Sequence, residues 1–210
     1  MIRKMKTPLV WLMAFILWTI AVMTVDVRPI GPMESRVGFA MLNQFVHNLT
    51  GNNMTLYTIT DWLSIVPFAV CGLSGMVGLA QLIRRKSLAK VDRDIIALGV
   101  FYIIVIGAYA LFEIMPINYR PVLIEGVLEV SYPSSTTMLV MCVMPTAIMQ
   151  FKSRIKNPMF RRIVTSITWA FIAFMVIGRL ISGVHWFTDI VGGALVSAGL
   201  VLMYRSISGL

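Results

Sequence analysis

The side chains best suited to chemistry form the pattern Arg179-x5-His185-x3-Asp189 near the C-terminal end of the chain. Asp189 follows His185 by four residues, so the two would share one face of a helix that begins near the histidine. A carboxylate in that place could accept the proton of one imidazole nitrogen and leave the other nitrogen free as a nucleophile. The permanently charged guanidinium of Arg179 can bind two phosphate oxygens at once. The pattern therefore indicates phosphoryl transfer.

A second patch precedes this pattern, at residues 132–137, where a proline is followed by Ser134, Ser135 and Thr136. Proline followed by hydroxyl side chains is typical of a helix start. The free backbone N–H groups at such a start bind anions, and the hydroxyl groups add further donors. Helix capping alone explains the serines and threonine about as well as phosphate binding does.

These side chains belong to a chain that is 58% hydrophobic and only 13% charged. This composition lies outside the range of soluble domains and predicts a membrane protein. The net charge of +9 does not indicate nucleic-acid binding, because the basic residues form short clusters between apolar stretches. Six stretches are long enough, or nearly so, to cross the hydrocarbon core. They are residues 8–25, 62–83, 95–115, 136–151, 163–181 and 190–204.

The basic residues also predict the orientation of these stretches. All but four of the 18 lysines and arginines lie at the termini and at alternate connections. By the positive-inside rule, both termini and these connections are cytoplasmic. We expect the membrane to be the cell membrane. The exceptions, Arg28, Arg36, Arg120 and Arg179, lie on the outer side together with His185. The positive-inside rule disfavours arginines on that side, so their presence needs an explanation. For Arg120 or Arg179 alone, pairing with a nearby carboxylate could be enough.

The outer segment between the first two apolar stretches, residues 26–61, has apolar residues at roughly helical spacing between positions 37 and 46. We interpret it as a helix lying along the membrane interface. The alternative is a polar loop, because Gly51-Asn52-Asn53 interrupts any helix there. The fold expected is an all-α bundle of about six transmembrane helices plus an interfacial helix, in one domain spanning residues 1–210.

The patches together resemble the membrane-bound type 2 phosphatidic acid phosphatase (PAP2) superfamily. The pattern of that family is Lys-x6-Arg-Pro, then Pro-Ser-Gly-His, then Ser-Arg-x5-His-x3-Asp, all on one membrane face. This chain has Glu113-x6-Arg120-Pro121, Pro133-Ser134-Ser135-Thr136 and Gly178-Arg179-x5-His185-x3-Asp189. The similarity covers residues 113–193, where the third motif is fairly specific and the first two are degenerate.

The resemblance implies a role for each matching residue. His185 would be the nucleophile that forms a phosphohistidine, and Asp189 would orient it. Arg179, Arg120 and the hydroxyl segment 134–136 would hold the phosphate. No metal and no cofactor is implied, and the partners would be membrane lipids, one of them a phospholipid or polyprenyl phosphate or diphosphate that serves as substrate.

The chain departs from the family pattern at Glu113, where the family has lysine, and at Thr136, where it has a second histidine that protonates the leaving oxygen. Glu113 is expected to pair with Arg120 and not to donate a proton, although it remains a possible modulator. An alkoxide leaves poorly without a proton, since its basicity is near that of hydroxide (water pKa about 15.7). A leaving phosphate monoester has a second pKa of about 6, so a diphosphate tolerates the missing histidine better.

The favoured function is therefore a metal-independent, extracytoplasmic lipid phosphatase acting on a polyprenyl diphosphate. A phosphatidic acid or phosphatidylglycerophosphate phosphatase is one alternative. A catalytically impaired relative that binds or moves phospholipid is another, and a general transporter is disfavoured because the apolar stretches lack paired charges. The other histidine of the chain, His47, could supply the acid if the outer segment folded over the site, but an ordinary interfacial histidine is the simpler interpretation.

Overall fold

The computed structural model describes residues 2–209, so Met1 and Leu210 of the predicted 1–210 domain lie outside the described residues. Apolar segments satisfy their backbone hydrogen bonds within a bilayer by forming helices, and the described chain is almost entirely helical. Its helices are α1 (Ile2–Thr24), α2 (Ala40–Thr50), α3 (Met54–Leu63), α4 (Ile65–Arg85), α5 (Arg93–Glu113), α6 (Ser135–Arg154), α7 (Pro158–Ile181) and α8 (Phe187–Ser208), with single 3-10 turns at Pro32–Glu34 and Leu88–Lys90. The predicted all-α membrane bundle is confirmed.

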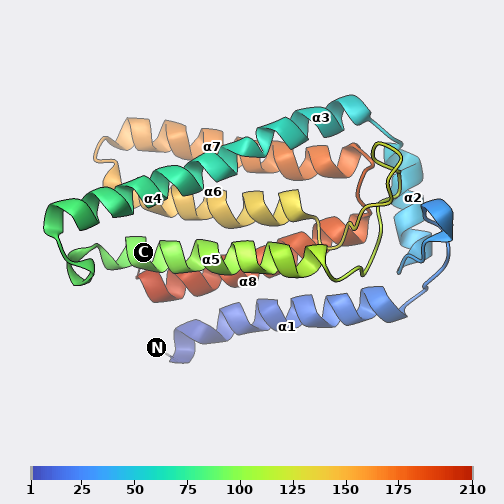
Figure 1. The fold of residues 1–210 in the computed structure, drawn as a ribbon, viewed down its shortest axis with the longest axis horizontal. Coiled ribbons are helices and arrows are strands. Elements are labelled where there is room, and N and C mark those ends of the chain that lie inside the picture. Colours follow the sequence, from blue (N-terminus) through green and yellow to red (C-terminus); the bar gives the residue numbers. More distant parts are fainter. Residues whose placement is uncertain (1, 210) are drawn as a thin grey trace.

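The long helices run side by side (Figure 1). Within residues 2–209, five helical stretches have the length and composition to cross a membrane, namely α1, α3 and α4 taken together, α5, α7 and α8. The sixth predicted stretch is α6, which has 20 residues but is less apolar. It packs against α4, α5, α7 and α8, and most of its residues are buried by protein. Its weaker hydropathy follows from this central position, where lipid does not contact it.

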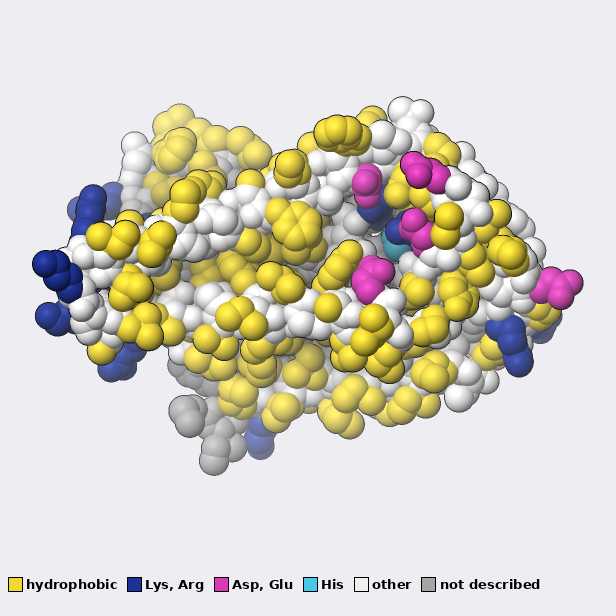
Figure 2. Space-filling model, viewed as in Figure 1, with side chains coloured by type: hydrophobic (Ala, Val, Ile, Leu, Met, Phe, Trp, Pro, Cys, Tyr) yellow, Lys and Arg dark blue, Asp and Glu magenta, His cyan; other side chains and the backbone are white. Residues whose placement is uncertain are grey.

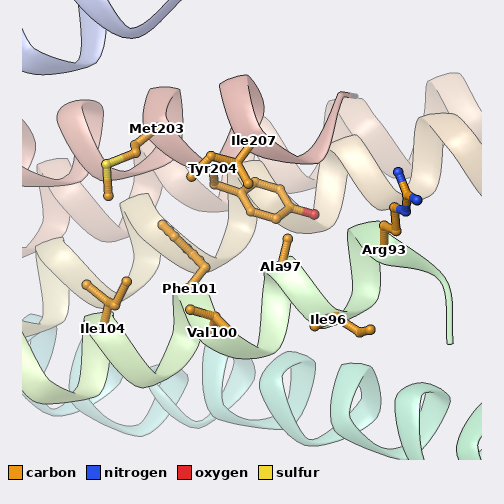
Figure 3. A pocket seen from close by; sticks show the side chains of 9 residues that line it. All are labelled: Arg93, Ile96, Ala97, Val100, Phe101, Ile104, Met203, Tyr204 and Ile207. Carbon is orange, nitrogen blue, oxygen red and sulfur yellow. The ribbon is translucent and has the colours of Figure 1, made fainter. Parts of the chain in front are cut away.

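The surface of the bundle suits a lipid environment. Large hydrophobic side chains are exposed along α1, α4, α5 and α7, and they cover much of the face in Figure 2. An apolar groove of about 350 Å³ lies between α5 and α8 (Figure 3), lined by Arg93, Ile96, Ala97, Val100, Phe101, Ile104, Met203, Tyr204 and Ile207. Lysines and arginines gather at the end of the bundle that holds the α4–α5 connection (Figures 1 and 2). The opposite end is called the outer end below.

The outer segment forms a helix, as predicted, and α2 crosses the outer end of the bundle (Figure 1). The amide of Asn43 fixes it there, since its nitrogen donates to Thr188 Oγ1 (2.9 Å) and its oxygen accepts the Thr188 backbone N–H (3.1 Å). Thr188 belongs to the first turn of α8, so α2 is held against the start of that helix.

The second predicted span was placed too late in the sequence, because helix resumes at Met54 and not at Trp62. Asn53 caps α3 by accepting the Leu56 N–H (2.9 Å), and its own N–H donates to Ser182 O (2.9 Å) in the α7–α8 turn. Gly183 in that turn has φ +68°, and a Cβ there would lie 1.8 Å from the Gly51 carbonyl oxygen. The helix break at 51–53 is therefore a docking point that brings α3 against the end of α7.

Candidate active site

His185 lies in the turn between α7 and α8, two residues before α8 begins, and is only 3% exposed. Its Nε2 is 3.4 Å from Arg120 Nη1. Because a guanidinium only donates hydrogen bonds, Nε2 must accept here, which assigns the imidazole proton to Nδ1. The nitrogen with the free electron pair therefore faces a fixed positive charge.

Asp189 lies beside this imidazole, but it does not make the hydrogen bond that the sequence suggested. Its Oδ2 is 3.8 Å from His185 Nδ1, which is beyond hydrogen-bond length. The carboxylate instead caps α8 by accepting the Trp186 N–H (3.0 Å), and it accepts a second bond from Asn118 Nδ2 (3.1 Å). In this arrangement Asp189 acts on His185 as a nearby negative charge whose position is fixed by the helix start.

Arg179, in the last turn of α7, is 2% exposed. Its Nη2 donates to Thr136 Oγ1 (2.6 Å) and to Asp61 Oδ1 (2.9 Å). The ring of Tyr57 lies 5.0 Å from its Cζ. Among the described residues, its Nε has no hydrogen-bond partner. A buried charge with an unused donor is costly in a protein interior. A ligand oxygen that accepted the hydrogen bond of this nitrogen would remove that cost.

Arg120 lies in the irregular segment between α5 and α6, and its guanidinium lies 5.8 Å from the same Tyr57 ring. The predicted pairing of Arg120 with Glu113 is wrong, because its carboxylate partner is Glu129, with Nε and Oε2 2.9 Å apart. The reason is local. The backbone N–H of Arg120 donates to Glu129 O (2.9 Å), so the two residues lie opposite each other where the irregular segment folds back on itself. Glu125, which is also nearby in sequence, is exposed.

The two arginines line one cavity of about 470 Å³ at the outer end, between α4, α5, α6 and α7. Ser135, Thr136 and Glu113 line it too. Figure 2 shows a hollow at the outer end where dark blue, cyan and magenta side chains gather within a largely yellow and white face. The full lining is Asp61, Ser64, Phe68, Tyr109, Glu113, Arg120, Glu129, Val130, Ser135, Thr136, Leu139 and Arg179.

The predicted hydroxyl segment divides into two parts. Ser134 is the N-cap of α6 and is fully buried, with its Oγ near the Thr137 N–H (3.4 Å) and its own N–H donating to Asp189 O (3.0 Å). Ser135 and Thr136 in the first turn face the cavity. Ser134 therefore positions the helix start, while the next two residues can reach a ligand.

Burial lowers the pKa of His185 well below its ordinary value, and the charges of Arg120 and Arg179 lower it further. The imidazole is consequently neutral at neutral pH, which is the nucleophilic form. The ring of His47 lies at a tilt against that of Trp186, with ring centroids 5.5 Å apart. Burial lowers the pKa of His47 too. Neither histidine is among the residues that line the cavity, but His185 Nε2 lies 3.4 Å from Arg120, which does line it.

Several residues of the site escaped the sequence analysis. Tyr57, Thr60 and Asp61 of α3 all contact Arg179, and Glu129 contacts Arg120. One signal for Asp61 was present in the sequence, since a lone carboxylate within a long apolar helix is a candidate functional group. Within residues 2–209, no group of three or more His, Cys, Asp or Glu side chains could hold a metal ion.

Both the sequence and the fold of the chain are similar to those of known proteins. A sequence model of the PAP2 superfamily matches residues 114–209. No curated protein matches the sequence. Among solved structures, the chain is similar to the crystal structure described as the first transmembrane PAP2 type phosphatidylglycerolphosphate phosphatase, from Bacillus subtilis, with a TM-score of 0.63 and 18% identity over 95% of this chain and 94% of that one. The motifs and the family match agree that residues 114–209 are similar to the PAP2 superfamily, and the whole chain shares its fold with a membrane protein of the PAP2 type.

Proposed function

We propose that the protein hydrolyses a lipid phosphate through a phosphohistidine on His185. One observation carries the proposal: the buried imidazole of His185 presents Nε2 to Arg120, and Arg120 shares a cavity with buried Arg179, whose Nε has no hydrogen-bond partner within residues 2–209. Two fixed guanidinium groups stabilise the charge that develops on a transferring phosphoryl group. Ser135 and Thr136 line the same cavity and complete the surroundings of the phosphate, while Asp189 lies beside the imidazole.

The favoured substrate is a polyprenyl diphosphate. Thr136, at the motif position of the missing second histidine, is a hydroxyl bonded to Arg179 and is a poor acid for a basic alkoxide. A phosphate monoester leaves readily because its second pKa is about 6. The alternative substrate with a specific observation behind it is phosphatidylglycerophosphate, since the similar Bacillus subtilis protein is described as a phosphatase of that lipid.

The proposed site lies at the extracytoplasmic face of the cell membrane, with both termini in the cytoplasm. Support comes from the gathering of lysines and arginines at the end of the bundle opposite the cavity (Figure 2), as the positive-inside rule requires. A phosphate carried by a membrane lipid would then lie level with the cavity.

The test is an assay of phosphate release by the full chain in detergent with a chelator present, with polyprenyl diphosphate, phosphatidylglycerophosphate and phosphatidic acid as separate substrates. We expect hydrolysis that persists in chelator, is fastest with the diphosphate, and is abolished in His185→Ala. His47→Ala is the matched control, and we expect it to retain activity on the diphosphate. A wild-type protein that binds these lipids but hydrolyses none of them would support the impaired relative instead.

A further inference from the structure

One face of α3 is built around Arg179. Tyr57, Thr60 and Asp61 are spaced as neighbours on a helix, and each of them contacts this guanidinium: the ring at 5.0 Å, Thr60 Oγ1 at 3.5 Å and Asp61 Oδ1 at 2.9 Å. The PAP2 sequence match covers residues 114–209 and leaves α3 outside it. The helix therefore adds a wall to the cavity that the family motifs do not describe.

The proposed function, on which this inference rests, requires two chemical steps. In the first, His185 Nε2 bonds to phosphorus while the bond from phosphorus to the leaving oxygen breaks. In the second, a water oxygen bonds to phosphorus, the P–Nε2 bond breaks, and its electron pair returns to the imidazole. The attacking water must also lose a proton, so the second step needs a proton acceptor in the cavity.

His185 cannot accept that proton, because its Nε2 carries the phosphoryl group until the P–N bond breaks. Thr136 is a hydroxyl and is a weak base. The cavity contains three carboxylates that could serve, namely Asp61, Glu113 and Glu129. The question is which of them is held against the phosphate site with an oxygen free for water.

Asp61 meets both conditions. Its Oδ1 and Thr136 Oγ1 bind the same nitrogen of Arg179, so the carboxylate shares a guanidinium with the proposed phosphate site. Within residues 2–209, its Oδ2 accepts no hydrogen bond from another side chain or from the backbone. The side chain is 54% exposed, so water reaches it. Its place on a helix fixes it more firmly than a loop would.

The other two carboxylates fit less well. Glu129 binds Arg120 much as Asp61 binds Arg179, but it lies in the irregular segment before α6, which fixes a side chain less firmly than a helix does. Glu113 lies at the last residue of α5, beside Tyr109, and pairs with neither arginine in the described part of the chain. We propose that Asp61 is the general base that takes the proton from the water hydrolysing the phosphohistidine, and that it then releases this proton to solvent.

The experiment is rapid-quench kinetics on the full chain in detergent, with a polyprenyl diphosphate labelled in its terminal phosphate. Appearance of polyprenyl monophosphate reports the first step, and release of inorganic phosphate reports the second. For Asp61→Asn, which preserves shape and an oxygen for Arg179, we expect the first turnover to stay within a few-fold of wild type. Phosphate release should slow by about 10²-fold or more, so that acid-labile, alkali-stable phosphoenzyme accumulates.

Three variants accompany it. Glu125→Gln changes an exposed carboxylate outside the cavity and should match wild type. Glu113→Gln tests the rival base in the cavity. The double variant Asp61→Asn, His185→Ala should form no phosphoenzyme, which shows that the trapped phosphate is on His185. Affinity for inorganic phosphate, measured on Asp61→Asn, should stay near the wild-type value because the arginines are intact.

The outcomes separate the two proposals. If Asp61→Asn accumulates no more phosphoenzyme than wild type, or if Glu113→Gln accumulates it instead, Asp61 is not the base, while wild-type hydrolysis still stands. A loss of both steps in Asp61→Asn with weakened phosphate binding would make Asp61 a support for Arg179 and would likewise overturn the inference. If wild type hydrolyses no lipid phosphate, the proposed function itself fails.

Discussion

Arginine–carboxylate clusters lie at both ends of the bundle, and they differ in what surrounds them. At the basic end, Arg85 and Arg154 bind Asp92 (2.7 and 3.4 Å), and Arg154 also binds Asp94. At the outer end, Arg179 binds Asp61 and Arg120 binds Glu129, both at 2.9 Å. The pair chemistry is the same, but the side chain of Arg154 is 37% exposed and that of Arg179 is 2% exposed.

Solvent decides what each cluster can do. Exposed ion pairs are screened and contribute at most about 1 kcal/mol each. A buried guanidinium is costly unless its donors are satisfied, and in the part of the chain that the structure describes Arg179 Nε is unpaired beside a cavity. The basic cluster therefore joins the ends of α4, α5 and α6. The outer cluster keeps a donor that an anion in the cavity could satisfy.

The largest effect that this comparison predicts is on activity. Arg179→Lys should lower kcat/KM about 10²- to 10³-fold, because an ammonium cannot reproduce the donors of the guanidinium toward a transferring phosphoryl group. Arg154→Lys should leave kcat/KM within about two-fold, since an exposed pair loses little. Both are measured on the diphosphate substrate, with circular dichroism as a check on folding. Equal losses in the two variants would mean that burial does not distinguish the clusters.

The next effect is a shift in pH dependence. Burial, then Arg120, then Arg179 lower the pKa of His185, so its neutral form persists as the pH falls below the ordinary histidine range. The acid limb of kcat/KM, which reports the free enzyme, should therefore lie well below the ordinary pKa of about 6.5. In Arg120→Gln one of the depressing charges is gone, the pKa of His185 rises, and the acid limb should move to higher pH. An unmoved limb would show that another group controls it.

Much of this molecule could be predicted from hydropathy and motif spacing, because lipid demands long apolar helices and the third motif is short and local. Asp61 illustrates what could not be predicted. It meets Arg179 across 118 residues of sequence, and only the docking of the 51–53 break onto the α7–α8 turn brings α3 there. Glu129 replaced Glu113 as the partner of Arg120 for a similar reason, since backbone pairing in an irregular segment leaves no periodic signal.

The smallest predicted effect concerns the stability of the basic end. The hydrogen bond from Arg85 is the largest cause that lowers the pKa of Asp92, followed by one from Gln81. A carboxyl group with a lowered folded-state pKa contributes stability above its unfolded pKa of about 3.9 and loses it as the pH falls through the folded value. Arg85→Gln should thus lower the free energy of unfolding by at most about 1 kcal/mol at neutral pH, and the difference from wild type should vanish in acid. Thermal unfolding in detergent at pH 7 and pH 3 measures this difference. A loss well above 1 kcal/mol would show that solvent does not screen the ion pairs of the basic cluster as their exposure implies.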